Sequence, residues 1–599
     1  MTSRFLLPFA AALLASTAAQ ATDLIYTNGD ILTMAGKKPA YVEALAVDGG
    51  KIVYAGPKDD AMAMKTAETK VIDLQGHTLL PGFIDTHGHM VYFGKNLIDA
   101  DLFGTKDIPD LIARMKAQAE KTPDGAWIVG FGYSARKLAE GRTPTVEELD
   151  EVSKDRPVMI VDSSGHLGAG NSALFKLTGI DAATKDPEGG AFARKPGGTD
   201  LAGPMEETAL NMVRKQRPPF TGKVAQQAIT GAADRWASYG QTTAMECGLG
   251  LGDDDVDIVK EAIDHNILKI DLYLCAKDSV ADKVIAEAKA VRAEYKAAAR
   301  DGDDATGRQD LIAAEGSSAP GTSAQKLLAA RPDLDKRYIN RVRLGGIKFW
   351  LDGSTDTAWF SQPYAKNPPG KEGVYKGYQQ IPDAVLDAAF DKYWTSDIQI
   401  NMHMNGDAAA DQALRAIDKA IAKYGMRDHR PVFIHASYMR PEQITHMGKV
   451  GGIPSYLTSS LVSGGAGALI LWGGERGNKV MAAHTMEEKG LPFTFSHDAP
   501  VSPEPWILPL VDAAVNRALP DGRIIGEKER VDPYVALKAV TAYAAYQIKD
   551  EKTKGTLEPG KLADLVILEK DPLKVDPKTI KDIKILETVK EGETVWKAP

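Results

Sequence analysis

LLPGFIDTHGH, residues 79–89, is the stretch that decides the fold of this 599-residue chain. Its apolar run through Phe83 and Ile84 ends in His87 and His89, where a strand would pass into a loop. Because side chains alternate along a strand, both imidazoles project to the same side and can bind one divalent cation. Two hydrogen-bonded histidines near a turn would give the same pattern, so the rest of the chain decides between these interpretations.

The pattern of an apolar run that ends in a chemically active residue recurs along the chain. From residue 79 to about residue 550, strand-like runs alternate with helical stretches, which is typical of a parallel sheet with crossover helices. The runs end at His89, His166, Glu246, Cys275, Lys348, His403, His435, Tyr456 and Asp498. These nine runs are one more than the eight strands of a (β/α)8 barrel. The run at 157–162 lies in a segment rich in Gly, Pro and charged residues, so we assign it to an insertion. We therefore predict an α/β fold, a TIM barrel over residues 79–552 with an insertion at about 95–225 after its first strand.

Short strands joined by turns make up both ends of the chain. Asn28-Gly29 and Asp48-Gly49 separate apolar runs near the N-terminus, which is a hairpin signal, and the C-terminal end has the same composition. We predict one composite β-sandwich domain built from residues 22–78 and 553–599.

The first 21 residues have the features of a secretory signal peptide. Arg4 is followed by an apolar run over residues 5–15 and by Ala19-Gln20-Ala21, a small-residue cleavage site. A buried N-terminal helix is the alternative. No later apolar run approaches the roughly 20 residues of a membrane helix. We predict a periplasmic or secreted protein that does not insert into a membrane.

Composition excludes two further classes. The net charge is −9 and no basic block is present, which argues against nucleic acid as a partner. The chain has two cysteines, Cys247 and Cys275, at the ends of neighbouring predicted strands. We expect buried free thiols there rather than a disulfide framework.

The strand order brings a metal-competent set to one end of the barrel. Functional groups collect at the C-terminal ends of barrel strands, and the set is His87 and His89, Lys348, His403, His435 and Asp498. Each residue alone has a structural alternative: a salt-bridged lysine, a core histidine, or a helix cap at Asp498. Their recurrence at successive strand ends favours a metal centre.

The motifs resemble those of the amidohydrolase superfamily, in the branch of N-substituted formamide deformylases and related exported amidohydrolases. The matching stretches are PGFIDTHGH at 81–89, KFWLDGS at 348–354, HMNGD at 403–407, FIHA at 433–436, SHDAP at 496–500 and GKLADLV at 560–566. The resemblance implies a (β/α)8 barrel and one or two divalent metals held by His87, His89, His403, His435 and Asp498. It further implies a bridging carbamate on Lys348, without which a mononuclear site is expected.

These ligands imply hydrolytic chemistry. Imidazole and carboxylate suit zinc, with manganese or iron as alternatives, and coordination lowers the pKa of water from 15.7 to about 7. Asp498 would accept the water proton and pass it to the leaving group.

We expect an exported hydrolase that cleaves a C–N bond in a small amide, N-formyl or N-acyl compound. An ester, lactone or carbamate hydrolase is the alternative on the same site. From another class, the alternative is a periplasmic binding or regulatory protein that has lost catalysis. The sequence leaves open whether the chain forms a homo-oligomer.

Other residues are predicted around the metals. His166, Glu246, Trp350 and Asp352 are candidates for substrate binding, with loop-structuring or ligand-positioning roles as alternatives for the first two. Asp407 is expected to cap a helix over 408–424, and the Gly-rich stretch 463–467 to form a lid or a flexible connection. His497 stands where a small residue is more usual, and it could add a ligand or crowd the site.

Overall fold

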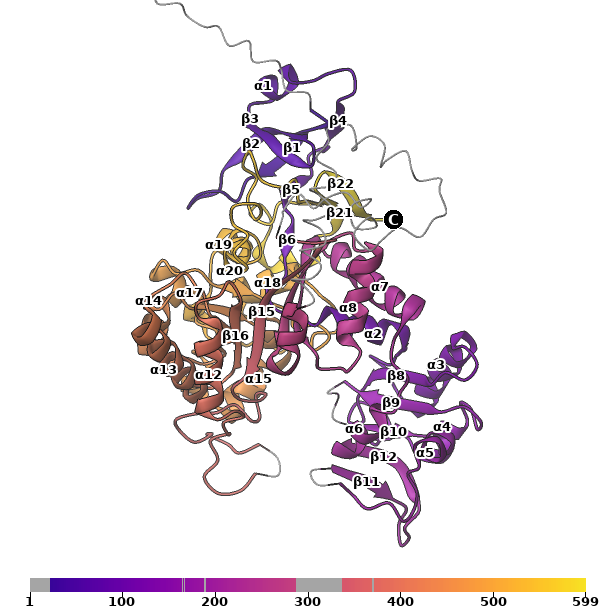
Figure 1. Ribbon diagram of the computed structural model, residues 1–599. Helices are drawn as coiled ribbons and strands as arrows, with labels where there is room; N and C mark the ends of the chain where they lie inside the picture. The colour runs from indigo at the N-terminus through magenta and orange to yellow at the C-terminus, as the bar shows by residue number, and fades with distance from the viewer. Residues whose placement is uncertain (1–21, 164, 166, 188–189, 287–336, 369–370) are drawn as a thin grey trace, which may run out of the picture.

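An eight-stranded parallel barrel forms the centre of the computed structural model, which describes residues 22–163, 165, 167–187, 190–286, 337–368 and 371–599 (Figure 1). Its strands follow one another in chain order, and every ladder between them is parallel. They are β6 (Phe83–Ile84), β13 (Gln241–Leu249), β14 (Asp271–Lys277), β15 (Val342–Trp350), β16 (Gln399–Met404), β17 (Val432–His435), β18 (Ile453–Tyr456) and β19 (Thr494–Phe495). The predicted barrel is therefore confirmed, with its strands in the predicted order.

Hydrogen bonds between the segments that follow β6 and β19 close the barrel. The Thr86 hydroxyl donates to the carbonyl of Phe495 at 2.9 Å. The Asp498 amide donates to the carbonyl of His87 at 3.0 Å, and the His89 amide donates to that of Ala499 at 2.9 Å. Closure of the barrel thus joins the first and last predicted ligand segments through their main chains.

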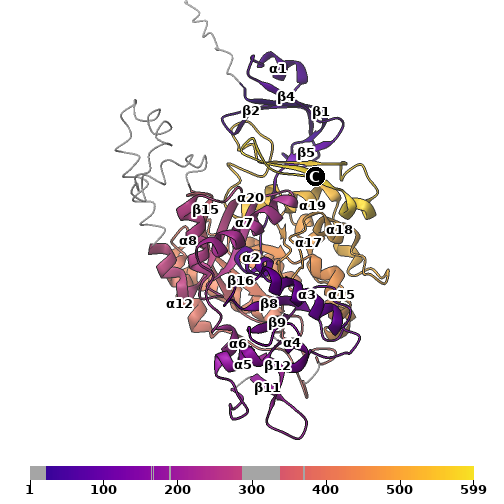
Figure 2. The same ribbon diagram turned by 90° about the vertical axis from the view of Figure 1, so that its right-hand side faces the viewer.

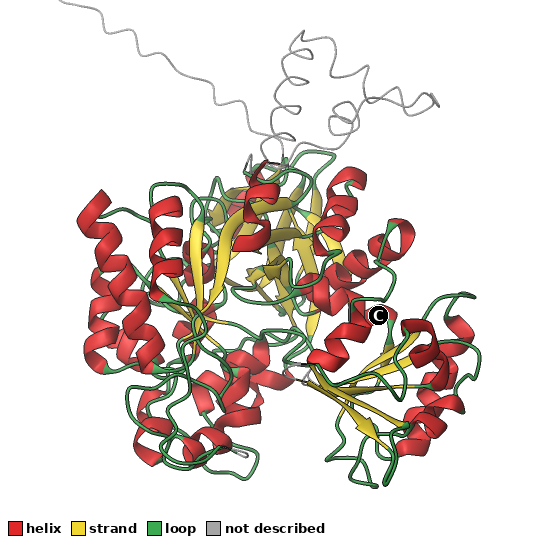
Figure 3. Ribbon diagram, turned by 60° about the horizontal axis from the view of Figure 1, so that its bottom comes forward, coloured by secondary structure: helices red, strands yellow, loops and turns green. Residues whose placement is uncertain are grey.

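Helices surround the barrel strands, as Figure 3 shows. The segments between and after the strands form α2 (Met90–Ile98), α7 (Gly222–Ser238), α8 (Asp255–His265), α12 (Asp383–Tyr393), α13 (Asp407–Tyr424), α14 (Pro441–Lys449), α15 (Ser459–Leu471), α16 (Gly474–Gly477), α17 (Ala483–Glu488), α18 (Leu508–Asn516), η1 (Glu527–Glu529), α19 (Pro533–Ala539) and α20 (Ala542–Gln547). No helix in the described part of the chain combines the length and apolar character needed to cross a membrane.

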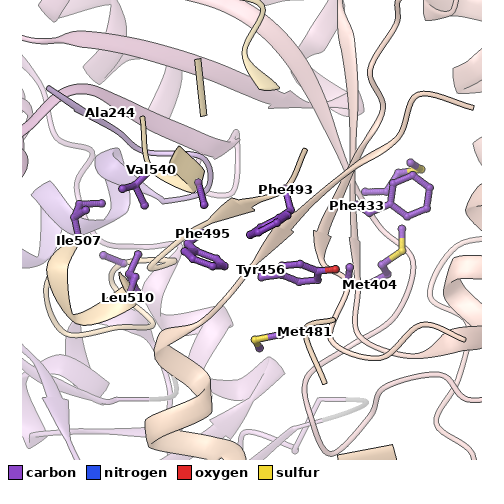
Figure 4. Packing of buried hydrophobic residues seen from close by; sticks show 14 of the residues in the cluster. Ala244, Met404, Phe433, Tyr456, Met481, Phe493, Phe495, Ile507, Leu510 and Val540 are labelled. Carbon is purple, nitrogen blue, oxygen red and sulfur yellow. The ribbon is translucent and has the colours of Figure 1, made fainter. Parts of the chain in front are cut away.

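The main apolar core lies between strands and helices. Figure 4 shows Phe433, Tyr456 and Phe495 near the strands, with Ile507 and Leu510 of the C-terminal region packed close by. A second cluster, to which β6, β13, β14 and β17 contribute, fills the inside of the barrel. Strands that are buried on both faces need near-continuous apolar runs, which is why these runs were visible in the sequence.

The segment assigned to an insertion forms a separate six-stranded sheet in the order β11-β12-β10-β9-β8-β7. Its elements are β7 (Ala100–Asp101), α3 (Ile108–Lys121), β8 (Ile128–Tyr133), α4 (Val146–Asp150), β9 (Val158–Asp162), β10 (Leu167–Gly170), α5 (Ser172–Thr178), β11 (Gly190–Arg194), β12 (Leu201–Glu207) and α6 (Thr208–Arg214). Two apolar clusters of its own hold it together. The apolar run at 157–162 therefore belongs to this sheet and not to the barrel.

Both ends of the chain meet in one eight-stranded sheet. It contains β1 (Leu24–Leu32), β2 (Tyr41–Asp48), β3 (Lys51–Gly56), β4 (Lys70–Asp73), β5 (Thr78–Pro81), β20 (Leu565–Leu568), β21 (Ile585–Lys590) and β22 (Glu593–Lys597), with α1 (Lys58–Ala63) and η2 (Pro577–Asp582) between them. β20 pairs antiparallel with β5, so that Leu565 lies opposite Pro81. Figures 1 and 2 place this terminal sheet and the insertion at opposite ends of the molecule. The predicted signal peptide, residues 1–21, lies outside the described residues.

Buried charges tie the terminal sheet to the start of β14. Asp271 accepts hydrogen bonds from Lys554 Nζ at 2.5 Å and lies 2.9 Å from Lys590 Nζ. Lys590 also contacts Asp564 at 3.0 Å. Removing one partner from such a group leaves an uncompensated buried charge, so this cluster fixes the terminal sheet at the N-terminal end of the barrel.

Two local expectations were wrong. Gly406, not Asp407, is the N-cap of α13, and the Asp407 carboxylate instead accepts hydrogen bonds from the Ser361 amide and hydroxyl. The Gly-rich stretch 463–467 is part of helix α15 rather than a loop. At Gly465 an added Cβ would lie 2.9 Å from Leu519, so the glycine serves close packing of a helix and not chain flexibility.

His429 makes stability depend on pH. It is buried against Trp394, its Nε2 accepts a hydrogen bond from the Ile400 amide at 3.2 Å, and burial lowers its pKa to about 3. Below its unfolded pKa of about 6.5, the unfolded chain binds a proton that the folded chain excludes. Stability from this group is therefore lost as the pH falls from 6.5 toward 3, by about 2 kcal/mol near pH 5.

We expect His429→Gln to flatten the acid limb of stability. Urea unfolding of the wild type and the variant between pH 7 and pH 4 measures the difference. His446→Gln is the control, because His446 lies on the surface next to Asp418. Parallel acid limbs for wild type and His429→Gln would contradict the assignment.

Candidate metal centre

Three predicted ligands meet at the C-terminal end of the barrel. The Nε2 atoms of His87 and His89 lie 3.1 and 3.2 Å from the same carboxylate oxygen, Oδ1 of Asp498. One potential ligand atom from each of the three residues lies within 4.8 Å of the other two. His87 and Asp498 are buried, and the His89 side chain is 12% exposed. The triad is thus enclosed yet reachable at His89.

The other three predicted ligands lie beside this triad. Lys348 Nζ is 3.4 Å from His87 Nε2, and His435 Nε2 is 3.7 Å from Asp498 Oδ2. The rings of His403 and His435 stand edge to face, with centroids 4.7 Å apart. Closure of the barrel therefore gathers all the predicted metal-ligating side chains, although they come from five different strands or strand ends.

Unusual backbone geometry aims two of these side chains. His435 and Asp498 have φ angles of 66° and 54°, in the left-handed region that non-glycine residues seldom adopt. Such conformations are costly and persist where surrounding structure holds them, as at functional sites. Here they occur at the ends of β17 and just after β19, where the chain must turn toward the site.

Carboxylates lie behind two of the histidines. Glu246 Oε1 is 3.6 Å from His89 Nδ1, while its Oε2 accepts a hydrogen bond from the Val91 amide at 2.7 Å. Asp352 Oδ1 is 3.4 Å from His403 Nδ1. A carboxylate on the far nitrogen of a ligating histidine fixes its tautomer and orientation.

These contacts concern two of the predicted substrate-binding residues. Asp352 is fully buried and accepts hydrogen bonds from the main-chain amides of Trp359, Asn405 and Gly406, an environment that favours a role in positioning His403. Glu246 is also buried, and the ligand-positioning alternative fits its contacts. Sequence periodicity places both residues at strand ends, but it does not show which way each carboxylate turns.

Trp350 lies at the edge of the site. Lys348 Nζ is 5.0 Å from the centre of its ring, and the residue is half-buried at the end of β15. This position agrees with the expectation that it lines the mouth. His166, the remaining predicted substrate contact, lies outside the described residues.

His497 does not point at the metal-binding atoms. Its Nδ1 accepts a hydrogen bond from the Ala499 amide at 3.0 Å, and its Nε2 is 3.4 Å from Asp85. Asp85 also accepts hydrogen bonds from the His87 amide and the Trp236 indole, both at 3.0 Å. Asp85 thus holds the segment from His87 to His89 in place. The sequence pattern did not indicate this role, although the acid stands two residues before His87.

The two cysteines are free and buried, as predicted. Cys247 and Cys275 belong to the cluster inside the barrel. They occupy the layer beneath the metal-binding side chains, because each precedes the C-terminal end of its strand by about two residues.

The protonation states in the site follow from burial and neighbours. Burial alone would raise the pKa of Asp498, but His87 and His89 hold it well below its usual range. Burial opposes the charged form of His89, yet Asp498 and Glu246 outweigh it and raise the pKa of His89 to about 10. Burial and the neighbouring His403 lower the pKa of His435.

The donor atoms fit a divalent cation. Among the described residues, Oδ1 of Asp498 is a buried atom without a hydrogen-bond partner, although two imidazole nitrogens face it. Leaving such an atom unsatisfied is costly, and a bound cation removes that cost. Imidazole nitrogen and carboxylate oxygen are a donor set that zinc accepts. His87, His89 and Asp498 would hold one ion, and His403 and His435 a second next to Lys348.

We expect Asp352→Asn to weaken metal binding by about 10- to 100-fold, because the amide cannot fix the His403 ring as the carboxylate does. Competition with a fluorescent chelator measures the metal affinity of each protein. Asp411→Asn is the control, since Asp411 pairs with Arg440 on the surface. Equal metal affinity in Asp352→Asn and the wild type would contradict the positioning role.

Comparisons with known proteins identify the family of this chain. A family model described as "Amidohydrolase family" matches residues 70–596. The chain is 25% identical to YtcJ of Bacillus subtilis (strain 168), covering 96% of this chain and 99% of that protein. It is 23% identical to the N-substituted formamide deformylase of Arthrobacter pascens, covering 96% and 98% respectively.

A solved structure shares the fold. The crystal structure of an uncharacterized metal-dependent hydrolase from Pyrococcus furiosus has a TM-score of 0.68 and 24% sequence identity, with 92% of this chain and 100% of that chain covered. At this level of identity the likeness concerns the fold alone.

Proposed function

The chain belongs to the amidohydrolase family, and from this premise we propose that it is a metal-dependent hydrolase that cleaves the C–N bond of a small amide, N-formyl or N-acyl compound. The observation that carries the proposal is the convergence of His87 and His89 on Asp498 Oδ1 at the mouth of the barrel, with contacts of 3.1 and 3.2 Å. Lys348 lies next to them, with its Nζ 3.4 Å from His87 Nε2. The N-substituted formamide deformylase among the relatives supports the choice of bond.

A divalent ion bound here supplies a Lewis acid that acidifies water and polarises a carbonyl oxygen. The protein's own contribution begins with Asp498, which His87 and His89 keep ionised. As a carboxylate at the site, it can accept a proton from the attacking water. Asp498 would then return this proton to the leaving amine, which an amide needs because an amide anion is a poor leaving group. Zinc is the proposed metal because the ligands are imidazole and carboxylate.

Lys348 is proposed to carry a carbamate that bridges two ions. The residue is 1% exposed and its amine lies beside His87, where an unmodified ammonium would repel a dication. A carbamate replaces this positive charge with a negative one and offers two oxygens.

Export is proposed from the N-terminal sequence, with the periplasm or the medium as destination. Small-molecule substrates are proposed because the site lies within a barrel mouth and the acidic chain does not favour nucleic acid.

The proposal is tested by measuring turnover of the mature, metal-loaded protein. The substrates are a panel of N-formyl and N-acyl amines, alongside matched esters and lactones. We expect the amides to be cleaved, activity to be lost with dipicolinate, and activity to return with Zn²⁺ or Mn²⁺. Faster cleavage of esters or lactones would favour the alternative hydrolase. Bound metal without turnover on any member would favour a binding or regulatory protein.

A further inference from the structure

Lys277, the last residue of β14, is a lysine at the metal end of the barrel that the metal centre does not use. It lies directly opposite Lys348 in the parallel ladder between β14 and β15. Neighbouring strands are about 4.8 Å apart, so the two lysines start from adjacent points on the barrel wall. Lys277 is half-buried.

Strand alternation places Lys277 on the inner face. Cys275, two residues earlier, belongs to the cluster inside the barrel, whereas Ala276 belongs to the core between strands and helices. On β15 the same alternation separates Ile347, which packs outside, from Lys348, which reaches His87. Residues two apart on a strand share a face, so Lys277 stands one layer above Cys275 at the mouth.

No counter-charge within the described residues engages Lys277: the structure gives its side chain no hydrogen bond, ion pair or ring contact. Lys95, by contrast, is paired with Asp254 and Asp255. The acid next in sequence, Asp278, accepts a hydrogen bond from the Tyr393 hydroxyl on α12, on the outside of the barrel.

The carboxylates of the site are engaged elsewhere. Glu246 accepts from the Val91 amide, Asp352 from main-chain amides near His403, and Asp498 faces His87 and His89. Within the part of the chain that the structure describes, this half-buried ammonium therefore has no acidic partner. Partly desolvated charges are favourable when they are paired, and an anionic substrate would supply such a partner.

We propose that Lys277 binds a carboxylate of the substrate, so that the compound hydrolysed is an N-formyl or N-acyl amino acid. This inference rests on the proposed function and adds a substrate class to it. Trp350 stands on the same inner face of β15 as Lys348, two residues further on, and offers an apolar wall to the amino-acid side chain. An apolar amino acid, with its carboxylate near the scissile amide, matches an ammonium and an indole that lie on the inner faces of the neighbouring strands β14 and β15.

Paired probes separate this inference from the proposed function. The first pair is N-formyl-leucine and N-formyl-isopentylamine, which differ by the carboxylate, and the second is the matching N-acetyl pair. We expect the wild type to prefer the carboxylate member in kcat/KM. In Lys277→Met this preference ratio should fall about 10- to 100-fold, the usual effect of losing a hydrogen bond to a charged group.

Two further variants sharpen the test. Lys277→Arg should keep most of the preference, and Lys269→Met should leave it unchanged, since Lys269 lies on the surface next to Asp234. Calorimetric titration of both probes at low temperature gives their affinities for the metal-loaded wild type and Lys277→Met even when turnover is absent.

The outcomes are distinct. A preference for the carboxylate probe that depends on Lys277, in kcat/KM or in affinity, supports the inference. Turnover of both probes without such a preference overturns it and leaves the proposed function standing. Absence of turnover together with Lys277-dependent binding of the carboxylate probe supports the carboxylate site at Lys277 but contradicts the proposed hydrolysis of these compounds. Equal binding of both probes overturns the inference in either case.

Discussion

Asp498→Asn is expected to fold and to lose turnover by roughly 10³-fold, within the range for removal of a general acid–base group. The substitution keeps the shape of the side chain and one oxygen that can face His87 and His89. It removes the negative charge that accepts a proton, and with it the route by which a proton reaches the leaving amine. The expected signature is a fall in kcat at saturating metal and substrate.

Asp498 is also a predicted ligand, so metal content must be measured alongside turnover. Inductively coupled plasma mass spectrometry of Asp498→Asn, loaded with excess Zn²⁺, separates loss of metal from loss of proton transfer. Asp512→Asn is the matched control, because Asp512 is a buried carboxylate on α18 that receives a hydrogen bond from Asn516. Near-normal turnover by a folded, metal-loaded Asp498→Asn would contradict the assigned role of Asp498 in proton transfer.

Lys348→Ala is expected to reduce bound metal from about two ions per chain to one or fewer, the change that loss of a bridging ligand produces in a two-metal site. The measurement uses mature protein produced with bicarbonate and without chelators. Activity should fall with the second ion. Added propionate should restore part of both, since its carboxylate can occupy the space that the carbamate leaves.

The alternatives give different results in the same experiment. One ion in both wild type and Lys348→Ala would retain the hydrolase and exclude the carbamate bridge. No retained metal in the wild type, with no activity on adding Zn²⁺ or Mn²⁺, would favour the binding or regulatory protein. Lys269→Ala, a surface variant, controls for handling of the protein.

The accuracy of the barrel prediction has a local physical cause. Parallel strands buried on both faces read as apolar runs. The predicted run ends lie either within the last few residues of a strand, as Glu246, Cys275 and Lys348 do, or at its end or shortly after it. The extra run at 157–162 was separated from the barrel by the composition around it. The prediction of a loop at the Gly-rich stretch 463–467 was wrong because tertiary packing outweighed local propensity. Gly465 packs against Leu519 and Ile525, and the stretch is helical despite the low helix propensity of glycine.

The sequence alone determined which side chains gather at the site. His87, His89, Lys348, His403, His435 and Asp498 follow from strand ends and alternation, because a barrel brings the C-terminal ends of all its strands to one face.

Only the tertiary structure decided what stands behind and beside those side chains. Asp352 lies against His403, Glu246 against His89, and His497 turns to Asp85 instead of the metal-binding atoms. These pairings depend on how loops from different strands pack, and on contacts between residues as far apart as Val91 and Glu246, 155 positions along the chain. The position of Lys277 beside Lys348 likewise became clear only from the register of β14 and β15, because a local sequence pattern contains no information about which strands become neighbours.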